Sequence, residues 1–325
     1  MKRHTNIFRW ILPALLLIVV GAAGQTHLAR GNRAYRDGDF PAAIAAYRAA
    51  VAENENPALA WFNLGNAQYQ NGAPQHAVAS WERAVLEAPG FGRGWLNLGV
   101  LYYELGDLGA AVAVLTRAEE ILGDEVTVLA LLGTAYKDLE QFGTAAVYLE
   151  RALEKDSTLS DATLMLYEIF WRMGDTREAL RWLERYPQQG PRRYDAVLLA
   201  GEARQALSDT AGALMLFRQA TALAPERMRG WMALVEHLSQ MGTPYTALLE
   251  ARRALEQHPG FTPLALLAGR IGFAAGYYDQ AEHFFTHAAA AGHPDGLVGV
   301  GNLIAVYNRL GEDAAVERLR RQTGH

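Results

Sequence analysis

The 325-residue chain contains no cysteine, and only 20% of its residues are charged. Without cysteine it can form no disulfide framework, thiolate zinc site, iron–sulfur cluster or cysteine nucleophile. The low charge content, set against 50% hydrophobic residues, is far from the composition of a disordered chain. The net charge of −5 leaves no basic excess of the kind that binds a nucleic-acid backbone. We therefore expect a chain that buries a core and binds no nucleic acid.

Motifs for catalysis and cofactor binding are also missing. The sequence has no GxSxG nucleophile elbow, no phosphate-binding GxxxxGK and no HExxH zinc motif. His283 and His287 lie four residues apart, with His293 beyond them, but no third fixed ligand accompanies the pair. Two partly exposed helix histidines are the simpler interpretation. We expect no enzymatic activity, no metal and no cofactor.

The amino terminus combines positive charge with a long apolar run. Lys2, Arg3 and Arg9 mark the charged end, and residues 7–24 are just long enough to span a bilayer as a helix. A cleaved signal peptide is the alternative, because small residues close the apolar run. We predict that residues 1–23 form a transmembrane anchor, or a signal peptide. The repeats would then lie on the periplasmic side of the cell membrane, or free in the periplasm after cleavage.

A spacing of 34 residues runs through the rest of the chain. Alanine recurs at this spacing without a break, at positions 43, 77, 111, 145, 179, 213, 247, 281 and 315. A second alanine series occupies positions 50, 84, 118, 152, 220, 254 and 288. Glycine follows the same period at positions 31, 65, 99, 133, 201 and 269, and again at 38, 72, 106, 174, 242 and 276. Apolar residues recur at helical spacing between these points, so each period predicts a helix, a turn and a second helix.

One period carries the pattern Trp95-x2-Leu98-Gly99-x2-Tyr102, followed by Ala111, Leu115 and Ala118. Related patterns begin at Trp61 and Trp231. Over about residues 24–325 the chain resembles the tetratricopeptide repeat family. The resemblance implies an all-α, right-handed superhelical solenoid of about nine helix-turn-helix repeats, preceded by the N-terminal transmembrane or signal helix.

A proline-flanked stretch interrupts the fifth repeat, where the second helix gives way to Tyr186-Pro-Gln-Gln-Gly-Pro191. We predict repeats 1–5 over residues 24–186, an irregular connection over 187–193, and repeats 6–9 with a capping helix over 194–325. The connection is either a bend between two sub-arrays or a rigid irregular turn.

The resemblance also implies a concave groove, lined by the first helix of each repeat, that binds peptide or protein segments. In the first three repeats the groove positions hold Asn32, Tyr35, Asn63, Asn66, Tyr69, Arg93, Asn97 and Tyr103. Asparagine offers a donor and an acceptor, so a ladder of asparagines can pair with a peptide backbone. The tyrosines supply stacking area, and the arginine can meet a carboxylate. Alternatively, the asparagines and tyrosines pack between repeats.

The later repeats carry a different groove chemistry. Glu168, Glu202 and Glu236 recur at the 34-residue spacing, with Trp171 as an apolar neighbour. A stripe of carboxylates favours a basic or amine-bearing partner segment. The alternative is a solvated acidic face.

These features together predict a membrane-anchored adaptor or scaffold that assembles or regulates a cell-envelope complex through protein or peptide partners. Homo-oligomerisation stays open. One alternative is a self-assembling structural repeat protein. Another is a permanent accessory subunit of an envelope enzyme, of the polysaccharide export, pilus or cytochrome maturation type.

Overall fold

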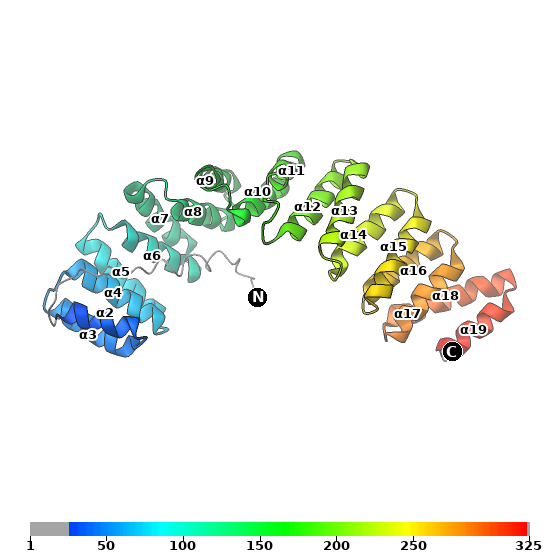
Figure 1. Cartoon of the computed structure of the whole chain (residues 1–325), viewed down its shortest axis with the longest axis horizontal. Coiled ribbons are helices and arrows are strands. Elements are labelled where there is room, and N and C mark those ends of the chain that lie inside the picture. The colour runs from blue at the N-terminus through cyan, green and yellow to red at the C-terminus, as the bar shows by residue number, and fades with distance from the viewer. Residues whose placement is uncertain (1–25, 324–325) are drawn as a thin grey trace. The chain divides into compact units, whose positions relative to one another are not determined.

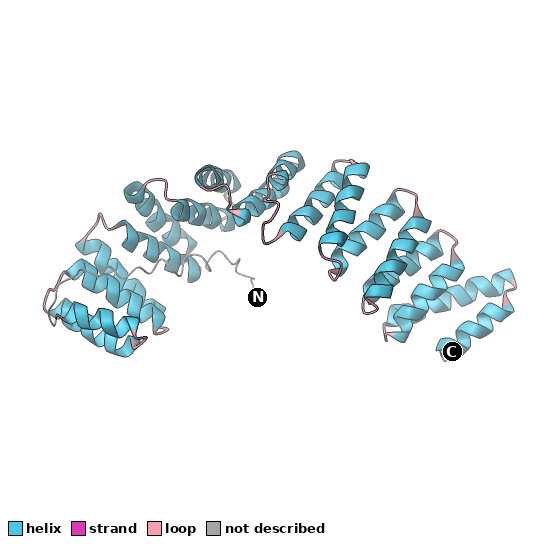
Figure 2. Ribbon diagram, in the orientation of Figure 1, coloured by secondary structure: helices cyan, strands magenta, loops and turns pink. Residues whose placement is uncertain are grey.

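The computed structural model describes residues 26–323, and every regular element in this range is a helix (Figures 1 and 2). The chain divides into two compact units, unit 1 (Met1–Gly174) and unit 2 (Asp175–His325). No helix among residues 26–323 is both long and apolar enough to cross a bilayer. The predicted N-terminal membrane segment lies outside the described range.

Unit 1 contains four antiparallel helix pairs and a ninth helix that packs on the fourth pair. Its helices are α2 (His27–Arg36), α3 (Phe40–Ala52), α4 (Pro57–Gln70), α5 (Pro74–Glu87), α6 (Gly92–Glu104), α7 (Leu108–Leu122), α8 (Val126–Asp138), α9 (Phe142–Lys155) and α10 (Ser160–Arg172). Each helix contacts its partner most extensively and then the first helix of the next pair. Such stacking gives the nearest-neighbour architecture of a repeat array.

Unit 2 begins with a single short helix and continues as four pairs. Its helices are α11 (Thr176–Glu184), α12 (Arg193–Ala206), α13 (Thr210–Leu223), α14 (Met228–Gln240), α15 (Pro244–Gln257), α16 (Thr262–Ala274), α17 (Tyr278–Ala290), α18 (Pro294–Leu310) and α19 (Asp313–Thr323). On α19, Ala315, Val316 and Leu319 are buried, and Arg318 donates two hydrogen bonds of 2.8 Å to Glu282 of α17.

The periodic small residues are packing positions, as their spacing predicted. Eight of the nine alanines in the first series are fully buried, and the ninth, Ala315, is 7% exposed. A Cβ added at Gly65 would lie 2.5 Å from the Trp81 ring, and one at Gly99 would lie 2.6 Å from Leu115. The glycine of a first helix therefore receives the large side chain located 16 residues later on its partner helix. Helices can approach this closely only where one side chain is missing.

A left-handed residue ends the first helix of most pairs. Gly38, Gly72 and Gly106 have φ values of 78°, 76° and 82°, a region that glycine adopts without strain. The same place is taken by Glu140, with φ of 60°, and by Ser208, with φ of 63°. The turn geometry thus persists where the glycine period breaks.

The proline-flanked stretch between α11 and α12 is an ordered turn built on Tyr186. The Tyr186 side chain is 2% exposed, and its hydroxyl accepts a hydrogen bond of 3.0 Å from the Arg192 backbone N–H. Gly190 covers the ring so closely that a Cβ there would lie 2.5 Å from it. The two-unit division falls at Gly174, before this turn. The expected sub-arrays 24–186 and 194–325 stay a prediction.

Candidate functional site

The first helices of the pairs form one face in each unit. In unit 1, α2 contacts α4, and α8 contacts both α6 and α10, whereas successive second helices lie further apart. In unit 2, α16 contacts α14 and α18. A stack whose first helices lie closer together curves toward them, so we call the exposed surface of the first helices the inner face of each unit.

The asparagines of unit 1 lie on this face but are turned into the core. Asn32, Asn63 and Asn66 are 7%, 1% and 2% exposed. Asn32 Oδ1 accepts hydrogen bonds from Tyr47 Oη at 2.8 Å and from Asn63 Nδ2 at 3.1 Å. These contacts link three helices, α2, α3 and α4.

The same arrangement recurs one repeat later. Asn66 Oδ1 accepts from Trp81 Nε1 at 3.1 Å and from Asn97 Nδ2 at 3.4 Å. The asparagine ladder of the sequence therefore exists, but its carbonyl groups are used by aromatic donors of the second helices and by the next asparagine. As folded, Asn32, Asn63 and Asn66 join helices, as the packing alternative expected. Binding of a partner by these three residues stays a prediction that requires their bonds to open.

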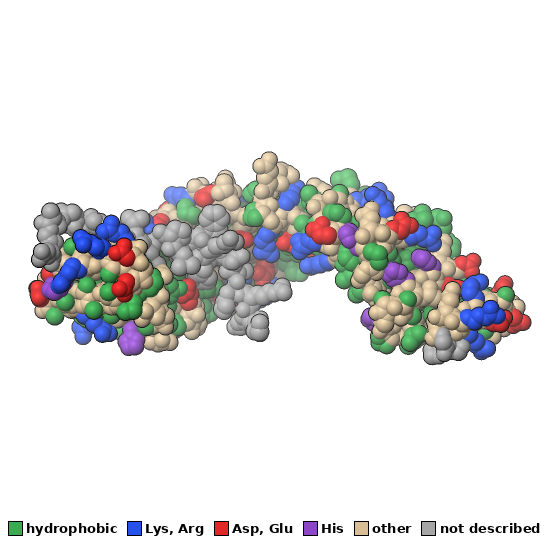
Figure 3. Space-filling view, turned by 60° about the horizontal axis from the view of Figure 1, so that its bottom comes forward, with side chains coloured by type: hydrophobic (Ala, Val, Ile, Leu, Met, Phe, Trp, Pro, Cys, Tyr) green, Lys and Arg blue, Asp and Glu red, His purple; other side chains and the backbone are tan. Residues whose placement is uncertain are grey.

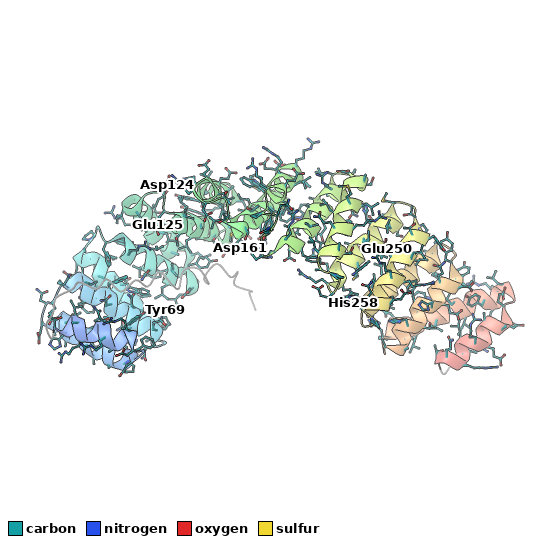
Figure 4. All side chains as sticks on the ribbon, viewed as in Figure 1. Tyr69, Asp124, Glu125, Asp161, Glu250 and His258 are labelled. Carbon is teal, nitrogen blue, oxygen red and sulfur yellow. The ribbon has the colours of Figure 1, made fainter. Side chains whose placement is uncertain are left out.

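The tyrosines of unit 1 pair with acidic residues of the following repeat. Tyr69, labelled in Figure 4, donates to both carboxylate oxygens of Glu104, at 3.1 and 2.9 Å. Tyr103 donates to Asp138 at 2.5 Å. Both pairs span 35 residues. Burial, then the hydrogen bond to Glu104, raises the pKa of Tyr69 to about 12, and burial together with Asp138 raises the pKa of Tyr103 further.

Loss of water raises the pKa of Glu104, although the hydrogen bond from Tyr69 opposes this shift. Tyr35 is half-buried, meets Phe40 edge-on at 5.5 Å, and has a raised pKa because of its burial. Glu104 and Asp138 are exposed and were not expected from the sequence. The signal that could have revealed them is the 35-residue offset between tyrosine and acid.

These tyrosines predict a loss of stability in alkaline solution. Their folded-state pKa values lie above the ordinary value of about 10, so the unfolded chain releases its phenolic protons first, and stability falls as the pH rises from about 10 to 12. Each such tyrosine contributes at most about 1.4 kcal/mol per pH unit. Denaturant unfolding at a series of pH values measures the slope. Tyr69→Phe should reduce it, whereas the control Tyr245→Phe, which changes a 50% exposed ring, should not. An unchanged slope in Tyr69→Phe would contradict the assignment.

The remaining candidate residues of unit 1 are exposed and paired. Arg93 lies 3.4 Å from Glu125. Glu168 lies between Lys137, at 3.3 Å, and Arg172, at 3.1 Å. Trp171 is 39% exposed. Glu168 is therefore not the free carboxylate that the sequence suggested, because two cations neutralise it.

Unit 2 holds the other two acidic candidates, in different states. Glu202 is bound by Arg229 at 2.8 Å. Glu236 is exposed, and none of the basic residues among 26–323 pairs with it. Arg270 occupies the repeat position of Glu236 on the next first helix, and it too is exposed and has no acidic partner in the described range. The position thus changes from acid to base within unit 2.

Arg270 also borders a hollow of about 560 Å³ on the inner face of unit 2. The hollow is lined by Ser239, Gly242, Pro244, Arg270, Ile271, Ala274 and Ala275. Its walls come from the end of α14, the start of α15 and the last turns of α16. The sequence search missed Arg270 because it looked for repeated residue types, and the charge here alternates.

The histidines and acids that could hold a metal are engaged within the fold. A ring nitrogen of His287 lies 2.8 Å from the Pro259 carbonyl. The group of His27, Glu53 and Glu55 is the cluster of metal-ligand type found among residues 26–323. Both Glu55 oxygens there accept backbone N–H groups at the start of α2, which lowers the Glu55 pKa. That carboxylate therefore caps a helix.

On the face that Figure 3 shows, basic and acidic side chains are interspersed and neither sign forms a continuous field. Local pairs and local unpaired charges therefore set what a ligand meets. Glu236 and Arg270 are such unpaired charges.

Sequence profiles described as tetratricopeptide repeat match residues 28–92, 74–125 and 137–200. No curated protein matches the sequence. The repeat period and the helix pairs thus agree with an independent measure of family.

Solved structures with the same fold include that of YrrB, described as a TPR protein with an unusual peptide-binding site. It is 22% identical, the match covers 57% of this chain and 96% of YrrB, and the TM-score is 0.51. Another is the C-terminal part of a TPR repeat-containing protein from Cytophaga hutchinsonii, at 14% identity, covering 73% of this chain and 98% of the other, with a TM-score of 0.60. At these identities the likeness establishes the fold alone.

Proposed function

This chain is a tetratricopeptide repeat protein, and from that premise we propose that it is a scaffold that binds protein or peptide segments on its inner faces. The observation that carries the proposal is the inner face of unit 2, where Glu236 and Arg270 stay unpaired beside an open hollow. Exposed charges on folded proteins commonly find partners, as Glu168 and Glu202 do here. Two unpaired charges of opposite sign on adjacent, packed helices suit a ligand that presents both signs.

A peptide segment has this property. Its backbone offers donors and acceptors, and its side chains can add an acid for Arg270 and a base for Glu236. Apolar side chains of the segment would be received by Ile271, Ala274 and Ala275 of the hollow. This arrangement replaces the purely basic partner that a stripe of three glutamates favoured.

Unit 1 contributes a second inner face of different chemistry. Its exposed groups are Glu104, Asp138 and Trp171, each supported by a neighbouring repeat or by aromatic stacking. Trp171 offers an exposed aromatic surface of the kind found at the centres of protein interfaces. The proposal therefore assigns partner contact to these side chains first, and to the buried asparagines only if their hydrogen bonds open.

Photocrosslinking in cells tests the proposal. A photoreactive amino acid would replace Glu104 or Trp171 in unit 1, and Glu236 or Arg270 in unit 2. We expect partner proteins to be captured at these positions. Matched controls at Leu86 and Met215, which are 68% and 73% exposed on second helices, should capture little. Equal capture at inner-face and control positions would refute the inner faces as the binding surface.

We also propose that residues 1–23 hold the scaffold at the cell membrane, with the repeats on the periplasmic side, where they assemble or regulate an envelope complex. The support is the sequence of this segment, in which three basic residues precede an uncharged apolar run. Fractionation and sequencing of the mature amino terminus check it: an intact terminus in the membrane fraction is expected. A terminus beginning near residue 24 would establish the cleaved form.

A further inference from the structure

A second hollow lies away from the inner face, in unit 1. It has a volume of about 330 Å³ and is bounded by two consecutive second helices, α3 and α5, with the first helix α4 as its floor. The residues that line it are Arg48, Val51, Trp61, Leu64, Gln68, His76, Ala79, Ser80 and Arg83. None of them is acidic.

The charged groups of this hollow have no partners. Arg48 and Arg83 stand on its two walls, both are exposed, and neither is paired with an acid among residues 26–323. Arg117, which occupies the repeat position of Arg83 one period later, is bound by Glu120 at 2.5 Å. The two guanidinium groups of the hollow therefore keep all their donors available.

A buried amide adds a donor from the floor. Gln68 is 6% exposed, and its Oε1 accepts a hydrogen bond of 2.6 Å from Ser80 Oγ, which is itself 3% exposed. Gln68 Nε2 donates to no group in the described range, and the residue lines the hollow. A largely buried amide nitrogen without an acceptor indicates a place where a ligand oxygen can sit.

The 34-residue period supplies an internal comparison. One period after Arg48 and Gln68 stand Glu82 and Tyr102, and there the tyrosine hydroxyl donates to the glutamate at 2.6 Å. One period further, Tyr136 stacks on Tyr148 with ring centroids 5.5 Å apart. Large paired side chains therefore occupy this place in the following repeats, whereas Gln68 and Ser80 leave it open.

We propose that the hollow between α3, α4 and α5 binds an organic anion. A carboxylate or phosphate group would accept hydrogen bonds from Arg48, Arg83 and Gln68 Nε2, and an apolar or aromatic part of the ligand would pack on Trp61 and Val51. Guanidinium groups bind both kinds of anion through paired N–H donors. The volume is that of a small-molecule site. This inference concerns a surface separate from the inner faces and does not depend on the proposed function.

Titration calorimetry of the full chain tests the site with phenyl phosphate, benzoate and phenol. We expect at least one of the two anions to bind, and phenol, which has the ring without the charge, to bind at least tenfold more weakly. Phenyl phosphate and benzoate distinguish phosphate from carboxylate recognition. Absence of binding by both anions, or equal binding of phenol, would overturn the proposal.

Three variants locate the binding. Arg48→Gln with Arg83→Gln should weaken the bound anion at least tenfold, since each charged hydrogen bond commonly contributes about that factor. The control Arg33→Gln with Arg117→Gln removes the same charge from other exposed surfaces of unit 1 and should leave affinity within about twofold. Arg48→Glu with Gln68→Tyr copies the pair found one repeat later and should abolish binding while helicity persists. Equal losses in the test and control pairs would show a general charge effect and reject the site.

Discussion

Trp81→Ala should reduce the free energy of unfolding of unit 1 by about 3–5 kcal/mol, the range found when large buried aromatic side chains are truncated. Trp81 is 3% exposed and fills the space that Gly65 leaves open on the partner helix. Its indole N–H donates to both the Phe62 carbonyl and Asn66 Oδ1, each at 3.1 Å. Truncation would leave a cavity beside a glycine, which has no side chain that could fill it.

Urea unfolding followed by circular dichroism measures this effect, and hydrogen exchange shows where it acts. We expect α4, α5 and α6 to lose protection first, because neighbouring repeats stabilise one another. Trp81→Phe should cost less, since it keeps the ring packing and removes only the N–H donor. Trp171→Ala is the matched control, because that ring is 39% exposed, and its cost should stay below about 1 kcal/mol. Similar losses for the two alanine variants would refute the packing role.

Gly296→Ala should reduce the stability of the end of unit 2 by about 2–3 kcal/mol, as expected for overpacking against a rigid neighbour. A Cβ added at Gly296 would lie 2.4 Å from the Ala289 backbone nitrogen and 2.8 Å from the Ala288 carbonyl carbon. Both are main-chain atoms of α17. They cannot rotate aside as a side chain can, so α18 would have to move as a whole.

The same helix provides the control. Gly301 of α18 is exposed, and a Cβ added there meets no atom within 4 Å. Gly301→Ala should therefore stabilise the helix by about 0.5–1 kcal/mol, because alanine loses less backbone entropy than glycine. Hydrogen exchange of α18 and α19 distinguishes the two variants, which make the same chemical change in one helix. If Gly296→Ala were as benign as Gly301→Ala, the close approach of α17 and α18 would be refuted.

The breaks in the repeat pattern show how far sequence reasoning reaches. Val235 stands where glycine was expected, and the residue 16 positions later is Ala251, where other repeats carry Trp81 or Leu115. Val235 and Ala251 are both fully buried in one core cluster. Large and small residues have exchanged helices there, so total volume is kept. The rule that one helix of a pair is small where the other is large could be obtained from the sequence, once the two positions were compared.

The polar groups of the candidate site were less predictable. Asn32, Asn63 and Asn66 were correctly placed in a ladder with a period of 34, but the ladder is 1–7% exposed and bound to Tyr47 and Trp81. The donors that use their carbonyls come from the second helices, 15 residues away. Whether a groove asparagine faces a ligand or the core depends on the rotation of its helix by a fraction of a turn. Helical spacing defines a stripe too broad to decide this.

The sequence by itself determined the family, the helix pairs and the packing positions, because each of these depends on local spacing: 34 residues between repeats, 16 between a glycine and the side chain that fills its place. Only the tertiary structure decided which polar groups stay available. Glu168 and Glu202 are neutralised by neighbouring cations, whereas Glu236, Arg270, Arg48 and Arg83 have no partners. The physical reason is that an ion pair needs atoms within about 4 Å. Side chains on three helices determine that distance, and no single stretch of sequence specifies it.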